Sequence, residues 1–213
     1  YLYRSHWRKD DATLHVLPHW TFPGREGETT PVYCYTSWPP AELFVNGKSQ
    51  GRIVKNPNTR LDRYRLRWNN VKYEPGELKV VAYGADGNKV GETSLHTAGK
   101  AAAVALKADK TVLAADGEDL AYVTVSLVDK DGNELPTASD NISVEVSGAA
   151  SFRGICNGDA TSLEVFTKPQ MKLFGGKLVV TLQSAAAPGV ATLKVVDKSN
   201  KNVKPASMEI EVK

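Results

Sequence analysis

The chain has 213 residues, of which 41% are hydrophobic and 24% charged, and its formal net charge is +3. This composition is ordinary for a globular protein, and the charges are too nearly balanced to imply nucleic acid or membrane partners. No apolar run approaches the roughly 20 residues of a membrane span, so we expect neither nucleic acid nor a membrane among its partners.

The first nine residues differ in character from the rest of the chain. Residues 1–9 (YLYRSHWRK) are aromatic and basic and lack any alternation of apolar and polar residues. The chain begins with Tyr1 rather than Met and shows no signal-like segment, so we expect a fragment or a processed form with any export signal upstream. We predict that residues 1–9 are the tail of a preceding domain.

The next segment, residues 10–98, shows the period-two alternation of β-strands. Residues 78–83 alternate in this way, and so do residues 63–68, where Arg63, Arg65 and Arg67 are expected to form the solvent face of an amphipathic strand. Trp68 should then point inward. Asn-Gly at 46–47 and Asp-Gly at 86–87 tolerate the positive φ angles of tight hairpin turns.

Composition changes near residues 97–100. All four Trp and all four His precede this point, whereas the second half is rich in Ala, Val, Ser and Thr. Alternation returns in residues 123–128, 142–146, 178–182 and 208–212, with an Asp-Gly turn at 131–132. We therefore predict an all-β protein of two immunoglobulin-like β-sandwich domains in tandem, covering residues 10–98 and 99–213.

The sequence contains few residues in patterns that are typical of a catalytic site. The sequence shows no marked pair of carboxylates and no Ser-His-Asp constellation. The Asn-Glu dipeptide at Asn133 and Glu134 directly follows an Asp-Gly turn, and the turn is the favoured interpretation. His15 and His19 would share a face on a helix, but Pro18 opposes a helix, and on a strand they would lie roughly 13 Å apart. We predict no catalytic residue and no metal site.

The segment NGDATSLE, residues 157–164, is rich in oxygen-bearing side chains but lacks the full pattern of an EF-hand. A plain loop is favoured, and a calcium site that uses Asn157 and Asp159 is the sharper alternative. No other cofactor is expected. Cys34 and Cys156 lie one in each half, and two free thiols, buried as small apolar residues, are favoured over a bridge between domains.

Tryptophan offers the sharpest binding hypothesis, because its π surface stacks on the apolar CH groups of sugar rings. Trp20 and Trp38 are the candidates for carbohydrate contact if they are exposed. The alternative is that each is a core residue of a small sandwich.

Several segments, taken in order, carry a family resemblance. HVLPHWTFPGREGE (residues 15–28), PVYCYTSW (31–38) and AELFVNGKSQG (41–51) resemble the domain that follows the catalytic barrel in Bacteroidetes-type β-galactosidases of glycoside hydrolase family 2. YLYRSHW (1–7) is similar to the last stretch of that barrel. The segment from residue 106 to 136 resembles a bacterial Ig-like domain, and GICNGDATSLEVF (154–166) resembles the C-terminal domain of the same enzymes.

The resemblance implies that the catalytic glutamates belong to the barrel, so none is carried over to this chain. It implies non-catalytic accessory domains that brace the barrel, shape its cleft or make homo-oligomer contacts, in a periplasmic, secreted or cell-surface glycosidase. His19 and Trp20 are then candidates to reach the barrel mouth and touch the sugar. Cys156 replaces the family's usual Gly, and Leu163 stands where His is frequent.

Two other classes of protein stay open on the sequence. A free-standing carbohydrate-binding module would need two or three exposed aromatic residues in a line on one face. An Ig-like stalk of an adhesin would repeat the pattern of residues 106–136, and the dissimilarity of the two halves counts against it.

Overall fold

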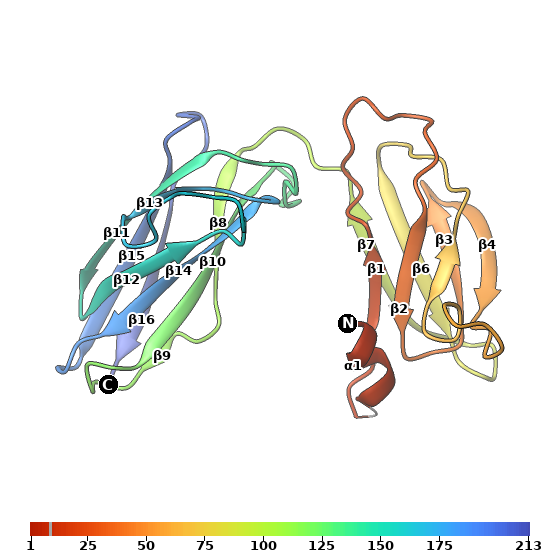
Figure 1. The fold of residues 1–213 in the computed structure, drawn as a ribbon, viewed down its shortest axis with the longest axis horizontal. Helices are drawn as coiled ribbons and strands as arrows, with labels where there is room; N and C mark the ends of the chain where they lie inside the picture. Colours follow the sequence, from red (N-terminus) through yellow and green to blue (C-terminus); the bar gives the residue numbers. More distant parts are fainter. Residues whose placement is uncertain (9) are drawn as a thin grey trace. The chain divides into compact units, whose positions relative to one another are not determined.

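The computed structural model describes residues 1–8 and 10–213, and these residues are almost entirely β-structure (Figure 1). They divide into two compact units, Tyr1–Thr97 and Ala98–Lys213. The predicted boundary, between residues 98 and 99, lies one residue further along the chain. No helix in the described part of the chain is long and apolar enough to cross a membrane.

The first unit begins with the only helix among the described residues, α1 (Leu2–Trp7). This helix is not predicted from the sequence, because six residues are too few to show a helical period. The Ser5 hydroxyl donates to the Leu2 carbonyl oxygen at 2.7 Å, and the His6 ring meets the Tyr64 ring edge-on at 5.0 Å. Lys9, the last residue of the predicted tail, lies outside the described residues.

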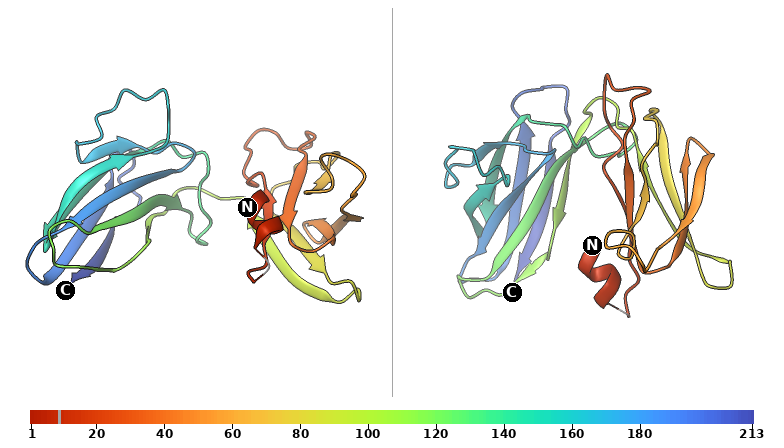
Figure 2. Two further views of the ribbon diagram at one scale, coloured as in Figure 1. Left: turned by 60° about the horizontal axis from the view of Figure 1, so that its bottom comes forward. Right: turned by 45° about the vertical axis from the view of Figure 1, so that its right-hand side comes forward.

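Two antiparallel sheets form the rest of the first unit (Figure 2). One has the order β1-β2-β5 and the other β4-β3-β6-β7. In chain order the strands are β1 (Leu14–Leu17), β2 (Val32–Thr36), β3 (Pro40–Val45), β4 (Lys48–Val54), β5 (Leu66–Trp68), β6 (Glu77–Tyr83) and β7 (Lys89–His96). Asn46 and Gly47 both have positive φ and close the β3–β4 hairpin, as predicted.

The core of the first unit is aromatic at one end. The rings of Trp20 and Tyr73 meet edge-on at 5.1 Å, and Phe22 meets Tyr73 in the same way at 5.4 Å. The indole N–H of Trp20 donates to the Glu74 carbonyl oxygen at 3.0 Å. The apolar bodies of these rings are thus buried while the polar indole N–H is satisfied, as a stable core requires.

The predicted strand over residues 63–68 is only half right. The strand β5 begins at Leu66, and residues 59–64 form turns instead, because the Asp62 amide donates to the Thr59 hydroxyl and the Arg63 side chain donates to the Pro57 carbonyl oxygen. Trp68 points inward as predicted, with 5% of its surface exposed. Its indole N–H donates to the Gly51 carbonyl oxygen at 2.9 Å.

The second unit is a sandwich of two sheets. One has the order β12-β14-β10-β8 and the other β13-β11-β15-β16-β9, with β9 alone parallel to its neighbour. The strands are β8 (Ala103–Ala108), β9 (Val112–Leu113), β10 (Leu120–Val128), β11 (Asn141–Gly148), β12 (Ala150–Cys156), β13 (Gln170–Lys172), β14 (Lys177–Ser184), β15 (Gly189–Asp197) and β16 (Ala206–Val212).

Alternation in the second unit places one face of each strand in the core, as the sequence predicts. Val123, Val125 and Leu127 of β10 are fully buried, and Leu178, Val180 and Leu182 of β14 pack beside them. These two strands are paired antiparallel, with Val123 opposite Val180. The intervening side chains therefore face away from the core and form the outer surface of this sheet.

Candidate functional site

Trp20, the first candidate for sugar contact, is 1% exposed. Its ring is enclosed by Tyr73 and Phe22, so it has no free face on which a sugar could stack. The structure therefore corrects the expectation of a sugar contact at Trp20. Trp20 is a core residue because its ring packs against Tyr73, which lies 53 residues further along the chain. A contact over that sequence distance cannot be predicted from a local pattern.

His19 and Trp38 are both half-buried. The His19 ring stacks on Phe22 at 4.4 Å, its Nδ1 accepts the Thr21 amide at 3.3 Å, and burial lowers the pKa of its imidazole. The indole of Trp38 lies over Gly91 of β7, 3.4 Å from the point where a β-carbon would stand. Sugar contact at these two residues stays a prediction.

The two histidines of the sequence hypothesis have different surroundings. His15 lies in β1 and stacks on Tyr1 at 3.5 Å, whereas His19 follows the cis peptide between Leu17 and Pro18. Throughout residues 1–8 and 10–213, no three His, Cys, Asp or Glu side chains are grouped so that they could hold an ion.

The calcium candidates use their oxygens within their own loop. The Asn157 side chain accepts the Asp159 amide at 3.0 Å and donates to the Lys172 carbonyl oxygen at 3.0 Å. Asp159 accepts both the amide and the hydroxyl of Thr161, and these bonds lower the pKa of its carboxyl group. This arrangement is that of a self-bonded turn, in which the side chains already have hydrogen-bond donors.

The two cysteines are both free, but only one is buried. Burial raises the pKa of the Cys34 thiol to about 12. Cys156 is exposed because it ends β12 opposite Val179, on the outer face of the sheet. The expectation of two buried thiols was therefore wrong for Cys156.

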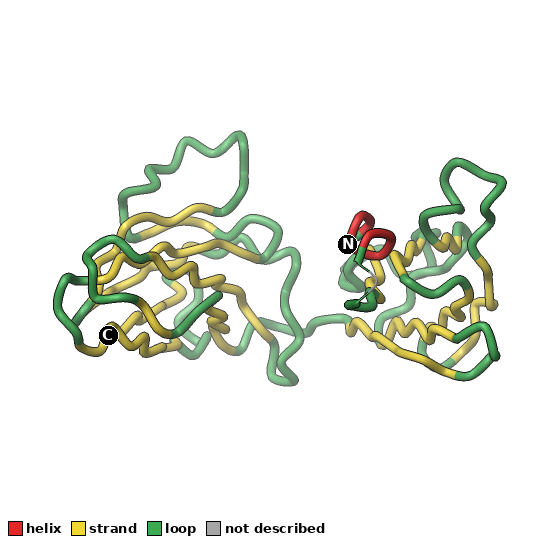
Figure 3. Tube along the Cα trace, turned by 90° about the horizontal axis from the view of Figure 1, so that it is seen from below, coloured by secondary structure: helices red, strands yellow, loops and turns green. Residues whose placement is uncertain are grey.

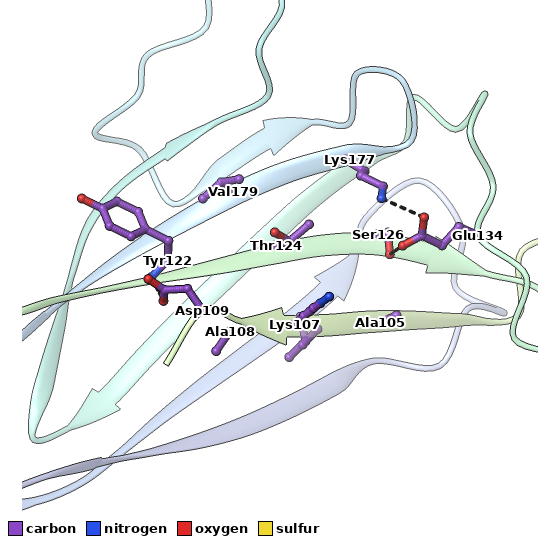
Figure 4. A pocket seen from close by; sticks show the side chains of 11 residues that line it. Ala105, Lys107, Ala108, Asp109, Tyr122, Thr124, Ser126, Glu134, Lys177 and Val179 are labelled. Carbon is purple, nitrogen blue, oxygen red and sulfur yellow. Dashed lines mark hydrogen bonds and ion pairs between the residues drawn. The ribbon is translucent and has the colours of Figure 1, made fainter. Parts of the chain in front are cut away.

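An open groove of about 420 Å³ lies on the outer face of β8, β10 and β14 (Figure 4). Tyr122 lies at one end, Thr124 in the middle, and Ser126 with Glu134 and Lys177 at the other end. No sequence motif marks this surface. Cross-strand register creates it, since Thr124 is opposite both Val179 and Lys107.

The chemistry of this groove is limited. Glu134, the one candidate for an acid/base group in the sequence, forms an ion pair with Lys177 at 2.8 Å and lies after the Asp-Gly turn as predicted. The carboxylate of Asp109 accepts the amides of Lys110 and Tyr122. No histidine occurs in the second half of the sequence to activate Ser126 or Thr124. Neither Ser126 nor Thr124 therefore has a histidine of its own half of the chain to activate it.

Figures 2 and 3 show the long loop between β12 and β13, which contains the calcium candidates and also carries exposed apolar side chains that the sequence did not lead us to expect. It displays Leu163, 97% exposed, together with Val165 and Phe166. No local signal marks this exposure, because residues 162–165 (SLEV) alternate polar and apolar residues just as a strand with one buried face would.

The fold defines a pair of β-sandwich domains. The model of the family described as glycoside hydrolase family 2 C-terminal domain 5 matches residues 104–209, and that of a domain of unknown function (DUF4982) matches residues 27–91. The chain belongs to glycoside hydrolase family 2, where it corresponds to C-terminal domains.

Relatives agree with this assignment. A β-galactosidase of Bacteroides ovatus is 42% identical over 195 residues, which are 91% of this chain and 22% of the relative. A β-glucuronidase described as putative, from Formosa agariphila, is 31% identical over 91% of this chain and 18% of its own length. The chain thus spans about a fifth of the length of these curated relatives.

Solved structures show the same fold over the whole chain. A β-glycosidase from Bacteroides vulgatus has a TM-score of 0.88 and 33% identity, covering 99% of this chain and 26% of that one. A glycosyl hydrolase family 2 member from Bacteroides cellulosilyticus has a TM-score of 0.86 and 30% identity, covering 100% of this chain and 30% of that one.

Proposed function

We propose that this chain is the non-catalytic C-terminal accessory region of a β-galactosidase-type glycosidase, where it braces the catalytic barrel and shapes its cleft. The observation that carries the proposal is the 42% identity, across nearly the whole chain, to about a fifth of a β-galactosidase. The parent would hydrolyse a terminal β-linked sugar with two carboxylates supplied by the barrel.

In the part of the chain that the structure describes, eight carboxyl groups have a pKa shifted in the direction opposite to that of a glycosidase's acid. A glycosidase needs one carboxylic acid whose pKa is raised, so that it can protonate the leaving group. Every Asp or Glu in the described residues with a shifted pKa has it lowered, by hydrogen bonds or a nearby cation, as for Asp62 beside Arg67. Such groups stay ionised and cannot serve as the acid at neutral pH.

Helix α1 supplies a surface for the barrel. Tyr3 and Trp7 stack on each other at 4.7 Å, and they are 66% and 73% exposed. Large apolar rings are usually buried, so a stacked aromatic pair that is exposed to water is typical of an interaction site. We propose that this face of α1 is covered by the catalytic region that precedes it.

The two alternatives have less support. A carbohydrate-binding module needs a line of exposed aromatic rings on one face of the sandwich, but the exposed pair of Tyr3 and Trp7 lies on α1, and Trp20 and Trp68 are core residues. An adhesin stalk would be built of similar repeats, but the two units match different family models.

The test compares the complete protein, the complete protein lacking these 213 residues, and the 213-residue chain alone. Each is assayed with chromogenic β-galactoside and β-glucuronide, because both activities occur among the named relatives. We expect hydrolysis by the complete protein, reduced thermal stability of the truncated one, and no hydrolysis by the 213-residue chain. Hydrolysis by that chain alone, or a complete protein without glycosidase activity, would refute the proposal.

A further inference from the structure

The loop of residues 157–169 is held together by its own polar groups. Ser162 and Glu164 bond to each other, and the Glu164 carboxylate also accepts the Lys172 amide at 3.1 Å. With the turns at Asn157 and Asp159, these bonds fix the course of the backbone. The return of the loop is fixed by the Ile155 amide, which donates to the Phe166 carbonyl oxygen at 2.9 Å.

The apolar side chains of the same loop point the other way. Leu163 is 97% exposed, Phe166 is 55% exposed and Val165 is 50% exposed. Glu164, between them, is half-buried. This arrangement is the reverse of an ordinary surface loop, in which polar side chains meet water. Leu163, Val165 and Lys168 also line an open hollow of about 560 Å³ with Pro169 and Gln170.

The backbone of this loop is already ordered in the free chain, which favours binding to a partner. Because its hydrogen bonds already order the backbone, association costs little further conformational entropy. Removing Leu163 and its neighbours from water supplies the driving force. The loop is therefore a preformed apolar contact for a partner surface.

We infer that residues 163–166 dock into an apolar hollow on the catalytic region of the same polypeptide. This inference rests on the proposed function. In the β-galactosidase of Bacteroides ovatus, the part that matches this chain is 22% of the length, so most of that polypeptide lies outside the matched part. That remainder is the partner available at the highest local concentration.

The size of the contact favours a tethered partner over a separate protein. Stable complexes of separate chains bury roughly 800 Å² on each side. Three side chains fall well short of that area. A partner joined through the chain has an effective concentration on the order of millimolar, at which a small apolar contact suffices.

Charge defines the partner surface further. Lys168 is exposed, lines the same open hollow as Leu163 and Val165, and has no ion-pair partner in the described part of the chain. The hollow that receives Leu163 should therefore be rimmed by carboxylates.

Site-specific photo-cross-linking tests the inference in the complete protein. A benzophenone amino acid replaces Leu163 in one preparation and Val190 in a control preparation. Val190 is 54% exposed and lies near the start of β15. The loop lies near the other end of β15, where Val196 pairs with Ser143, which lines the hollow beside the loop. After irradiation of dilute protein, cross-linked peptides are identified by mass spectrometry.

We expect cross-links from position 163 to peptides of the catalytic region, at least about ten times more abundant than those from position 190. A dimer band whose yield rises with protein concentration would overturn the inference and assign the loop to a second copy. Absence of cross-links from position 163 would also overturn it. If glycosidase activity of the complete protein persists in these two cases, the proposed function survives, whereas a complete protein with no glycosidase activity refutes the proposed function itself.

Discussion

The Thr97 hydroxyl donates to the Trp20 carbonyl oxygen at 2.6 Å across 77 residues of sequence. The hydroxyl oxygen of Thr97 also accepts the Gly76 amide at 3.0 Å and lies 3.4 Å from the Tyr73 hydroxyl. Thr97 is the last residue of the first unit. One side chain at the domain boundary thus ties the end of the sandwich to its aromatic core.

Replacing Thr97 with Val removes this hydrogen-bonding centre at nearly constant volume. We expect the first unit to lose about 1.5–3 kcal/mol of unfolding free energy, because a carbonyl oxygen and an amide lose their partner in a partly buried place. Urea denaturation followed by tryptophan fluorescence measures this, since all four tryptophans lie in the first half. Thr93→Val in β7 is the matched control and should cost less than about 0.5 kcal/mol.

Asp129 plays a similar part at the start of the second unit. Its buried carboxylate accepts the Gly99 amide at 2.8 Å, the Asn133 side chain at 3.1 Å and the amides of Asp131 and Asn133 at 2.9 Å. Burial by itself would raise the pKa of Asp129, but these hydrogen bonds outweigh it and hold the pKa well below its usual range.

Stability should therefore depend on pH through Asp129. Its folded pKa is lowered, so its contribution is present above the unfolded value of about 3.9 and is lost as the pH falls through the folded pKa. Asp129→Asn turns an NH₂ group toward backbone donors. We expect the free energy of unfolding at pH 7 to fall by about 1–3 kcal/mol. The loss should be smaller at about pH 2.5, where the contribution of the carboxylate is already reduced. Circular dichroism in urea at the two pH values measures it.

Asp131→Asn is the control for this experiment. Asp131 is exposed and forms a surface ion pair with Lys130 at 3.2 Å. Surface pairs contribute little, so this substitution should change stability by less than about 0.5 kcal/mol at pH 7. Equal effects of the two substitutions would contradict the role given to Asp129.

Substitutions at Leu163 and Leu182 compare how an exposed and a buried leucine contribute to the unfolding free energy. In the 213-residue chain, Leu163→Asp should change the unfolding free energy by less than about 0.5 kcal/mol, since the side chain is 97% exposed. Leu182→Ala in the core of the second sandwich should cost about 2–5 kcal/mol. Thermal unfolding measures both. A large loss from Leu163→Asp would mean that Leu163 has a structural role within its own unit.

The two thiols should react at very different rates. We expect about one equivalent of thiol, that of Cys156, to react rapidly with a thiol reagent in the native chain, because this side chain is exposed. Cys34 should react only after denaturation, since it is buried with a pKa raised to about 12. Absorbance at increasing pH follows the reaction, and Cys156→Ser should remove the fast phase. Two fast thiols in the native state would contradict the buried position of Cys34.

Much of the architecture could be predicted from local patterns. The alternation of residues 123–128 and 178–182 predicted strands with one buried face, and Asn46 with Gly47 predicted a hairpin turn. The order of several motifs indicated glycoside hydrolase family 2. These strand and turn signals are local, because a strand's period and a turn's φ angles depend on neighbours within a few residues.

The exposure of individual side chains was decided only by the tertiary structure. Trp20 and Trp7 are the same residue type, but one is enclosed by Tyr73 and the other lies in water on α1. Leu163 is displayed because Asn157, Asp159 and Glu164 direct their oxygens into the loop. The sequence by itself determined strands, turns and family, whereas the tertiary structure decided which surfaces can bind, because burial depends on contacts between residues far apart in the chain.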